Sequence, residues 1–173
     1  MKPKVLFIIT VIVLAGNGCK STSFKWQTTD KNEKILVGKI DRSQLLDKRT
    51  FPWFQTNYTN YNSAVNTDIL YLKAFNQRVT FVVFAGTWCD DTQNLLPKFY
   101  RVIDEARFQA TAVTLYAVDR NKKSLKGEAE TNQITNVPTF IVYKDGKEIG
   151  RIVESVKKSI ELDLKEMLVA VNK

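Results

Sequence analysis

A nearly continuous apolar segment, Val79–Ala85, constrains the fold of this chain more than any other feature of its sequence. The segment is rich in β-branched and aromatic side chains, which favour strands, and Gly86 ends it. A strand without a polar face must be covered on both sides, which is typical of the middle of a sheet that has parallel neighbours. We therefore predict an α/β domain in which this strand is central.

Periodic apolar residues predict helices around that strand. A long helix that begins at about Cys89 or Asp90 is predicted by apolar residues spaced three and four apart. These residues are Leu95, Leu96, Phe99, Ile103 and Ala106. Two shorter helices are predicted, one over residues 68–76 and one after the N-cap residue Ser159. Four further segments have the composition of strands: 35–40, 110–118, 139–143 and 148–153. Between the last two, the Asp-Gly pair of residues 144–147 predicts a tight hairpin turn, because these residues adopt the positive φ angles that such a turn needs. The expected architecture is a central mixed β-sheet flanked by helices on both faces.

One segment, residues 51–61, is unusually aromatic. It holds Phe51, Trp53, Phe54, Tyr58 and Tyr61. Four positions in and just after it repeat on one helical face: Phe54, Tyr58, Tyr61 and Val65. This spacing favours a helix that packs onto the domain. The same rings are suited to lining a ligand groove, and the spacing alone leaves both interpretations open.

The N-terminal residues have the organisation of an export signal. Two lysines precede an apolar run over residues 5–15, and small residues then lead to Cys19. The run is too short to span a bilayer, so we interpret residues 1–18 as a signal peptide. Small residues followed by a cysteine resemble the lipobox of bacterial lipoproteins, although Gly16 stands where an aliphatic residue is usual. The resemblance implies that Cys19 is diacylated and becomes the mature N-terminus.

This interpretation predicts an exported protein that its N-terminal lipid anchors to a membrane of the bacterial cell envelope, facing the periplasm. The alternative is ordinary cleavage, which leaves Cys19 as a free thiol that is able to resolve a disulfide elsewhere in the chain. Residues 19–33 are polar and lack an apolar period, so we expect a flexible tether there. The folded domain is expected over residues 34–173.

The composition excludes several kinds of site. The 173-residue chain has 26 Lys and Arg against 18 Asp and Glu, a net charge of +8, which favours anionic surfaces without naming one. It has no histidine, which excludes Ser-His and Cys-His mechanisms and His-ligated metals. Two cysteines are too few for a four-thiolate zinc site, so we expect no metal and no other cofactor. The basic loop 120–126 has no aromatic or helical stripe, so we interpret it as a solvated connection and expect no nucleic acid partner.

The central strand leads into a short motif that carries a thiol. Residues 86–92 read Gly-Thr-Trp-Cys-Asp-Asp-Thr, and Pro97 follows inside the predicted long helix. A later strand is opened by residues 137–139, Val-Pro-Thr. In this order the features resemble the thioredoxin-like superfamily. The Trp-Cys pair matches the start of the redox helix, residues 89–92 fall on its Cys-x-x-Cys motif, and Pro97 matches the proline that bends the helix. Residues 137–139 match the loop that carries a cis-proline and faces the thiol.

The resemblance covers about residues 35–171, with residues 42–65 as an insertion. It implies an α/β thioredoxin-like fold with an aromatic-rich helical insertion, and a cis peptide bond before Pro138. It assigns the chemistry to Cys89 and Thr92 as the catalytic residues. The substrate-binding positions that it implies are Trp88, Asp90, Asp91, Val137 and Pro138.

The setting of Cys89 is consistent with a nucleophile. Free backbone N–H groups and the helix dipole stabilise the thiolate of a cysteine in the first turn of a helix. Asp90 and Asp91 favour the helix start but repel a thiolate. Thr92 stands where a resolving cysteine is usual, so its hydroxyl is expected to donate to the Cys89 thiolate. Val83 stands where dithiol thioredoxins bury a proton-transferring Asp, and its presence is consistent with the lack of a second thiol to deprotonate.

Two hypotheses for the function follow. In the first, Cys89 exchanges with thiols or disulfides of envelope proteins, and an external thiol resolves the mixed disulfide. In the second, the chain is a binding module that holds a peptide or partner without turnover, because a thioredoxin-like fold does not by itself establish redox activity. A peroxide-reactive thiol is disfavoured, since no Arg or Thr in the pattern that peroxidases use is recognisable near Cys89.

Overall fold

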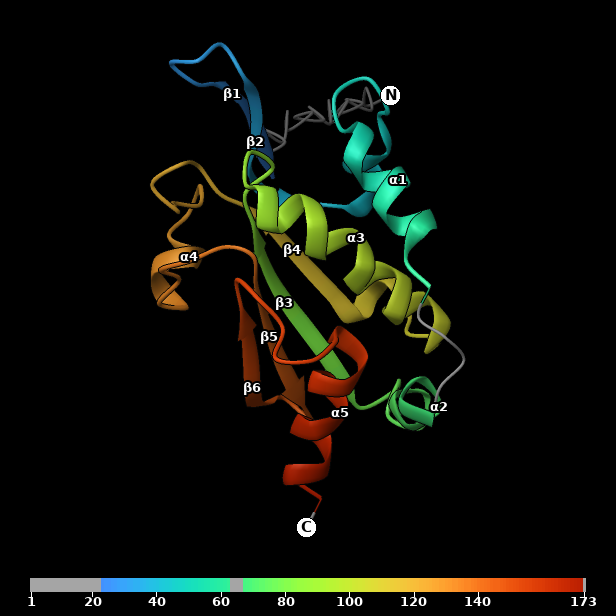
Figure 1. The fold of residues 1–173 in the computed structure, drawn as a ribbon. Helices are drawn as coiled ribbons and strands as arrows, with labels where there is room; N and C mark the ends of the chain where they lie inside the picture. Colours follow the sequence, from blue (N-terminus) through green and yellow to red (C-terminus); the bar gives the residue numbers. More distant parts are fainter. Residues whose placement is uncertain (1–22, 63–66, 173) are drawn as a thin grey trace, which may run out of the picture.

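The predicted central strand lies inside a six-stranded sheet with the order β1-β2-β4-β3-β5-β6 (Figure 1). The computed structural model of the protein describes residues 23–62 and 67–172. The apolar segment forms β3 (Val79–Ala85), which pairs in parallel with β4 (Val113–Ala117) and antiparallel with β5 (Thr139–Lys144). β3 therefore has a neighbour on each side, and the sheet is mixed, as the sequence predicted.

The remaining strands extend the sheet to both edges. β2 (Lys34–Ile40) pairs antiparallel with β4 and carries β1 (Phe24–Thr28) on its outer side. At the other edge, β6 (Lys147–Val153) pairs antiparallel with β5. The turn between β5 and β6 contains the predicted Asp-Gly pair, and both residues have positive φ, 50° at Asp145 and 80° at Gly146. The hairpin prediction is confirmed.

Strand β1 corrects the prediction of a flexible tether over residues 19–33. Residues 24–28 of that segment pair with β2, and the Trp26 ring stacks on Phe51 with the ring centroids 5.8 Å apart. An edge strand of this kind is held by backbone hydrogen bonds and presents most of its side chains to solvent, so it has no apolar period. The predicted signal peptide, residues 1–18, and the predicted lipidation site, Cys19, lie outside the described residues.

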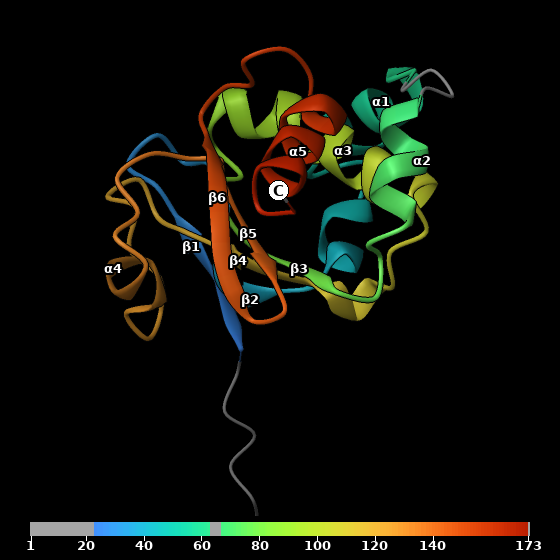
Figure 2. The ribbon, with the colours of Figure 1, turned by 90° about the horizontal axis from the view of Figure 1, so that it is seen from below.

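Helices cover the two faces of the sheet unequally (Figure 2). One face carries α1 (Pro52–Asn60), α2 (Thr67–Lys73), α3 (Asp90–Glu105) and α5 (Ile160–Ala170). Within residues 23–62 and 67–172, the one α-helix on the other face is the short α4 (Glu128–Thr131), which was not predicted because one helical turn shows no period. Among the described residues, no helix is both long enough and apolar enough to cross a membrane.

The predicted helix starts are confirmed by their caps. Cys89 is the N-cap residue of α3, and Ser159 is the N-cap residue of α5. The Ser159 hydroxyl oxygen accepts a hydrogen bond from the Leu162 backbone N–H at 3.3 Å, which satisfies one donor of the first turn. Glu161 and Asp163 follow in that turn, where the helix dipole favours carboxylates.

The hydrophobic core has two parts. The larger part lies between the sheet and the four helices, and Phe99 of α3, with 0% exposure, is in its middle. Its ring lies 4.8 Å from that of Phe140 and 5.3 Å from that of Phe81, centroid to centroid. The smaller part lies on the opposite face and consists of Phe84, Val118, Ala129, Val137 and Ile141, with Trp88 and Cys89 packed against it. The thiol therefore stands at the margin of the smaller core.

The aromatic insertion is anchored to α3. Phe51 and Phe54 are buried, with 2% and 0% exposure, so packing is the role of these two rings. Arg42, in the 3-10 turn η1 (Arg42–Leu46), lies over the Tyr58 ring and forms an ion pair with Asp104 of α3 at 2.7 Å. The Tyr58 hydroxyl donates to the same carboxylate at 2.7 Å. Trp53 and Tyr58 are only partly buried, which leaves part of the segment available for contacts with other molecules.

Replacing Phe99 with alanine tests the larger core. Phe99→Ala removes a fully buried ring that packs against β3 and β5 and is expected to lower the free energy of unfolding by about 3–5 kcal/mol. Urea unfolding followed by circular dichroism measures this loss. Leu70→Ala on α2 is the control, because Leu70 is 59% exposed and its truncation is expected to cost less than about 0.5 kcal/mol. A loss below about 1 kcal/mol at Phe99 would contradict the described core.

Candidate functional site

The turn between β3 and α3 positions the thiol. The Cys89 backbone N–H donates to the Gly86 carbonyl at 2.9 Å, which closes a tight turn directly after the strand. The Trp88 ring lies so close to Gly86 that an added Cβ would come within 2.7 Å of a ring carbon. This close approach accounts for the glycine. The turn delivers Cys89 to the N-cap position of α3, as the sequence predicted.

The Cys89 thiol faces the loop before β5. Its Sγ–H donates to the Val137 carbonyl with the two atoms 3.2 Å apart. The Val137–Pro138 peptide bond is cis, which confirms the expectation from the resemblance. Pro138 is buried, and its carbonyl accepts from the Glu154 N–H at 2.8 Å, which ties the loop to the end of β6. The structure thus brings together the thiol and the two loop residues that the sequence assigned to substrate binding.

Trp88 is held by contacts on several sides. Its indole Nε1–H donates to the Val118 carbonyl at 3.0 Å, and the Arg120 guanidinium lies 5.1 Å from the ring centroid. Arg120 also forms an ion pair with Glu33, in the turn between β1 and β2. The basic loop over residues 120–126 is therefore more than a solvated connection, because its first residue joins that turn to the site. No sequence pattern indicated this contact, since the three residues are far apart along the chain.

Thr92 has a different role from the predicted one. Its side chain has 0% exposure, and its hydroxyl oxygen accepts a hydrogen bond from the Gly86 N–H at 3.2 Å. The hydroxyl therefore fastens α3 to the end of β3. In the described part of the chain, no hydrogen bond joins Thr92 to Cys89, whose thiol uses the Val137 carbonyl instead. The expected donation from Thr92 to the sulfur is not made in this structure.

The two carboxylates after the thiol are exposed. Asp90 and Asp91 occupy the first turn of α3, where the helix dipole stabilises them. Neither forms an ion pair with another of the residues that the structure describes. They place negative charge beside Cys89 and in contact with solvent, where it acts on an approaching partner as well as on the sulfur.

The site has one thiol and an apolar interior. Cys89 is half-buried, and it is the only cysteine in the two described ranges. Val83 has 0% exposure, and β3 contains no ionisable side chain, so no proton-transferring group lies on the strand beneath the thiol. This arrangement suits a thiol that forms one mixed disulfide at a time and depends on a further thiol for its release.

A groove runs beside the thiol on the side of the aromatic insertion. Its volume is about 410 Å³, and we call it the Trp53 groove. The residues that line it are Glu33, Lys34, Ile35, Thr50, Phe51, Pro52, Trp53, Thr87, Trp88, Asp90 and Gln93. The spacing of the aromatic residues was compatible with a role in lining a groove as well as with packing. The structure divides that segment between the two roles, with Phe54 in the core and Trp53 in the wall of the groove.

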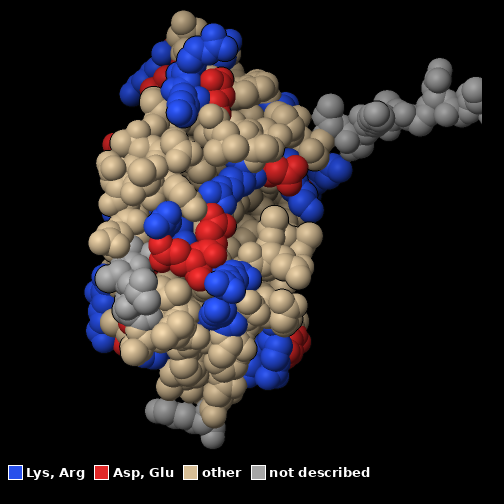
Figure 3. All heavy atoms as spheres, turned by 90° about the vertical axis from the view of Figure 1, so that its right-hand side faces the viewer, with Lys and Arg blue, Asp and Glu red and all other residues tan. Residues whose placement is uncertain are grey.

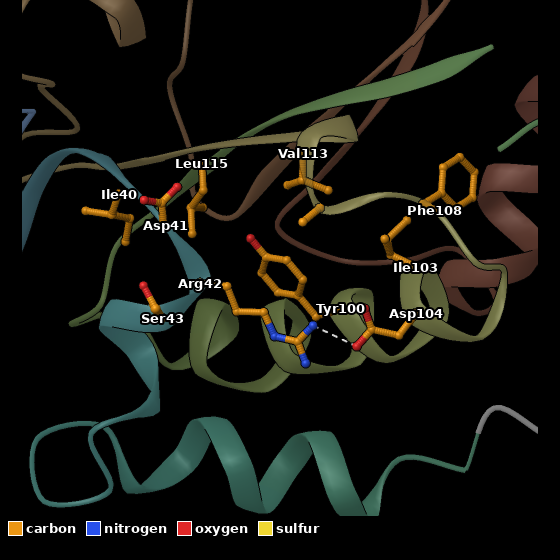
Figure 4. Close-up of a pocket in the computed structure, with 11 residues that line it drawn as sticks. Ile40, Asp41, Arg42, Ser43, Tyr100, Ile103, Asp104, Phe108, Val113 and Leu115 are labelled. Carbon is orange, nitrogen blue, oxygen red and sulfur yellow. Dashed lines mark hydrogen bonds and ion pairs between the residues drawn. The ribbon is translucent and has the colours of Figure 1, made fainter. Parts of the chain in front are cut away.

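A second cavity, of about 390 Å³, lies between the sheet and the far half of α3 (Figure 4). The Tyr100 hydroxyl points into this cavity, and burial raises the pKa of that hydroxyl well above its ordinary value. Arg42 and Asp104 form their ion pair at its rim. None of the lining residues belongs to the thiol motif or to the Val137–Pro138 loop, so this cavity is separate from the thiol site.

The net positive charge is not gathered into one patch on the face that carries α1 and α2. Figure 3 shows acidic and basic side chains mixed together there. Several of them form ion pairs: Arg42 with Asp104, Arg101 with Glu105, and Lys165 with Asp68. Paired charges of this kind attract an extended anionic partner only weakly.

Comparison with known proteins agrees with the site. The sequence model of the family described as thioredoxin matches residues 53–166, which is more than half of the chain. A thioredoxin-like protein of Acanthamoeba polyphaga mimivirus is 25% identical over 118 residues, covering 64% of this chain and 82% of that protein. The thioredoxin of Chlamydia pneumoniae is 30% identical over 77 residues, covering 43% of this chain and 68% of that protein.

A solved structure with a similar fold comes from Pseudomonas aeruginosa. It is a protein of unknown function that superposes with a TM-score of 0.52 at 16% identity, covering 78% of this chain and 81% of that one. At this identity the likeness concerns the fold alone. It supports the arrangement of sheet and helices described above.

A substitution at Thr92 separates its structural role from the predicted catalytic one. Thr92→Val leaves the buried Gly86 N–H without an acceptor, so the free energy of unfolding is expected to fall by about 1–3 kcal/mol. The alkylation rate of Cys89 in the folded chain is expected to change less than about threefold, because the thiol is hydrogen-bonded elsewhere. Thermal unfolding and iodoacetamide alkylation at neutral pH measure the two effects.

Thr92→Ser is the matched control for that experiment. It keeps the oxygen that accepts from Gly86 and is expected to retain most of the stability. A tenfold loss of alkylation in the valine variant, restored by serine, would show that the hydroxyl acts on the sulfur after all.

Proposed function

Because the chain belongs to the thioredoxin family, we propose that it performs thiol–disulfide exchange with Cys89 as the only reacting thiol of the domain. One observation carries the proposal. Cys89 is accessible at the start of α3, and its sulfur lies 3.2 Å from the carbonyl that precedes the cis-proline. A partner that reaches the sulfur therefore also lies against the Val137–Pro138 loop.

The reaction proceeds through mixed disulfides. The Cys89 thiolate attacks one sulfur of a client disulfide, a new S–S bond forms, and the other client sulfur leaves as a thiolate that takes up a proton. The thiolate of an external thiol then attacks the Cys89 sulfur and releases the second client sulfur, which is also protonated. A second external thiolate attacks the external sulfur now bound to Cys89 and frees the enzyme. One client disulfide is thereby reduced, and two external thiols are oxidised to one disulfide.

The groups around Cys89 affect the loss of its proton and the stability of the thiolate that attacks the client disulfide. The Val137 carbonyl accepts the S–H in the resting protein and is released when the thiol loses its proton. The free backbone N–H groups at the start of α3 then stabilise the negative sulfur. The negative charges of Asp90 and Asp91 oppose this stabilisation, so the thiolate experiences both favourable and unfavourable electrostatic interactions. Trp88 closes one side of the sulfur with a ring that is fixed by its bond to Val118.

The place of action is part of the proposal. Two lysines, an apolar run and small residues before Cys19 support export and lipidation, as argued from the sequence. We place the domain in the bacterial cell envelope, anchored to a membrane by a lipid on Cys19 and facing the periplasm. Its clients are then thiols or disulfides of envelope proteins, in a compartment where disulfides persist.

A binding module without turnover is the second candidate. The hydrogen bond from the Cys89 thiol to the Val137 carbonyl favours it, because this bond is made by the protonated, less reactive form of the sulfur. The buried Thr92 in place of a resolving cysteine favours it as well. In this case the thiol, Trp88 and the Val137–Pro138 loop hold a partner and no sulfur is exchanged.

The reactivity of Cys89 distinguishes the two candidates. In a chain that carries Cys19→Ser and is kept in detergent, Cys89 is the only thiol, and its reaction with glutathione disulfide at neutral pH is measured by mass spectrometry. Exchange is expected to be at least about tenfold faster in the folded chain than in the same chain unfolded in urea, because the helix start stabilises the thiolate. Cys89→Ser is expected to abolish it. A folded chain that reacts no faster than the unfolded one would favour the binding module.

The predicted lipid on Cys19 is tested on the full chain. When the gene is expressed in a Gram-negative bacterium, the protein is expected in the membrane fraction, with a mass that equals residues 19–173 plus the diacylglyceryl and acyl groups. Cys19→Ala is expected to move it out of that fraction. Intact mass spectrometry of both forms is the measurement, and a processed wild-type chain with an unmodified Cys19 thiol would contradict the prediction.

A further inference from the structure

The Trp53 groove lies next to the residues that flank the thiol. Trp88 and Asp90, the residues on either side of Cys89, both line it. The Cys89 sulfur contacts the Val137 carbonyl, and the other residues that line the groove come mainly from the segment before α1, from α1 and from the start of β2. A chain segment whose cysteine is joined to Cys89 therefore lies within reach of both the Val137–Pro138 loop and this groove.

Two half-buried tryptophan rings form the walls, and each is fixed from behind. The Trp53 ring contacts the buried Phe51 and Phe54 rings edge to face, with both centroid distances 5.8 Å. Trp88 is held by its hydrogen bond to Val118. Rings that are already ordered lose little conformational freedom when another ring packs on them, which makes them effective contact surfaces.

The charges around the groove do not select a charged occupant. Glu33 is already paired with Arg120, and the remaining charged residues, Lys34 and Asp90, have opposite signs. The accessible apolar surface comes from Pro52 and the Trp53 and Trp88 rings, because Ile35 and Phe51 are buried with 2% exposure each. An uncharged occupant with a large apolar surface is therefore favoured over an acidic or a basic one.

We propose that the Trp53 groove is a specificity site for the client, and that it takes an aromatic side chain adjacent to the client cysteine that reacts with Cys89. The inference rests on the proposed exchange at Cys89 and adds to it a preference that the thiol alone does not supply. Most of the groove outside the thiol motif, from Glu33 to Pro52, lies before residue 53, where the family match begins. The family match therefore does not assign this site.

The test compares two matched peptides. Each has one cysteine, activated as a mixed disulfide with thionitrobenzoate, and they differ only in having Phe or Ala next to that cysteine. Release of thionitrobenzoate is followed by absorbance with the full Cys19→Ser chain in detergent. We expect the Phe peptide to react about 5- to 20-fold faster than the Ala peptide, as packing of one ring in a partly apolar site allows.

Two variants connect this preference to the groove. Trp53→Ala removes a wall, and Thr50→Trp fills the groove from its exposed rim without removing a core contact. Both are expected to reduce the ratio of the two rates to below about twofold and to leave the rate with glutathione disulfide within about twofold of the starting protein. Leu70→Ala, on α2 and outside the groove, is expected to keep the full preference.

The outcomes separate the inference from the proposed function. A chain that exchanges with glutathione disulfide but shows no preference for Phe, or keeps its preference in both groove variants, would overturn the specificity site while the exchange stands. If no disulfide reacts, the proposed function fails, and calorimetry on Cys89→Ser with the reduced peptides decides about the groove. Tighter binding of the Phe peptide that is lost in Thr50→Trp then supports the site, and equal binding of the two peptides overturns it.

Discussion

Burial of the C-terminal end of β3 on both of its faces determines where the thiol lies. On one face the larger core fixes the direction of α3, because Phe99 packs against Phe81 of β3 and Phe140 of β5. On the other face Phe84 belongs to the smaller core, which also contains Val137 of the loop opposite the thiol. Both partners of the 3.2 Å contact at Cys89 are thus positioned by the same strand, from opposite sides. A change in the packing of either face is expected to alter this contact.

Sequence reasoning predicted the parts of the fold that have an apolar period. Features that depend on neighbouring residues could be predicted. They are the central strand, the start of α3 at Cys89, the hairpin at Asp145 and the Ser159 cap. β1 and α4 were missed for the opposite reason. β1 is an edge strand whose stability comes from backbone pairing, and α4 is a single turn, so neither produces a pattern in the side chains.

The candidate site was predictable in its members but not in all of their roles. Family resemblance brought together Trp88, Cys89 and the Val137–Pro138 loop, and the structure has them in contact. It also gave Thr92 a catalytic hydroxyl, whereas among the described residues that hydroxyl accepts from the Gly86 N–H and makes no hydrogen bond to Cys89. The hydrogen-bond partner of a buried hydroxyl depends on small differences in local backbone geometry. The spacing of residues along the sequence does not specify such differences. The Arg120 contact with Trp88 was equally inaccessible, since it joins distant loops.

Strand β1 also limits how far the domain would extend from a lipid on Cys19, if that residue is lipidated as proposed. The Ser23 carbonyl accepts from the Lys39 N–H at 2.8 Å, so the chain is bound into the sheet from that residue onward. Only four peptide units separate Ser23 from Cys19, and a fully extended chain of that length spans about 14 Å. With a lipid at Cys19, the domain would rest close against the bilayer surface. Its clients would then be membrane proteins and proteins close to the membrane surface. Soluble proteins far from the membrane would be out of its reach.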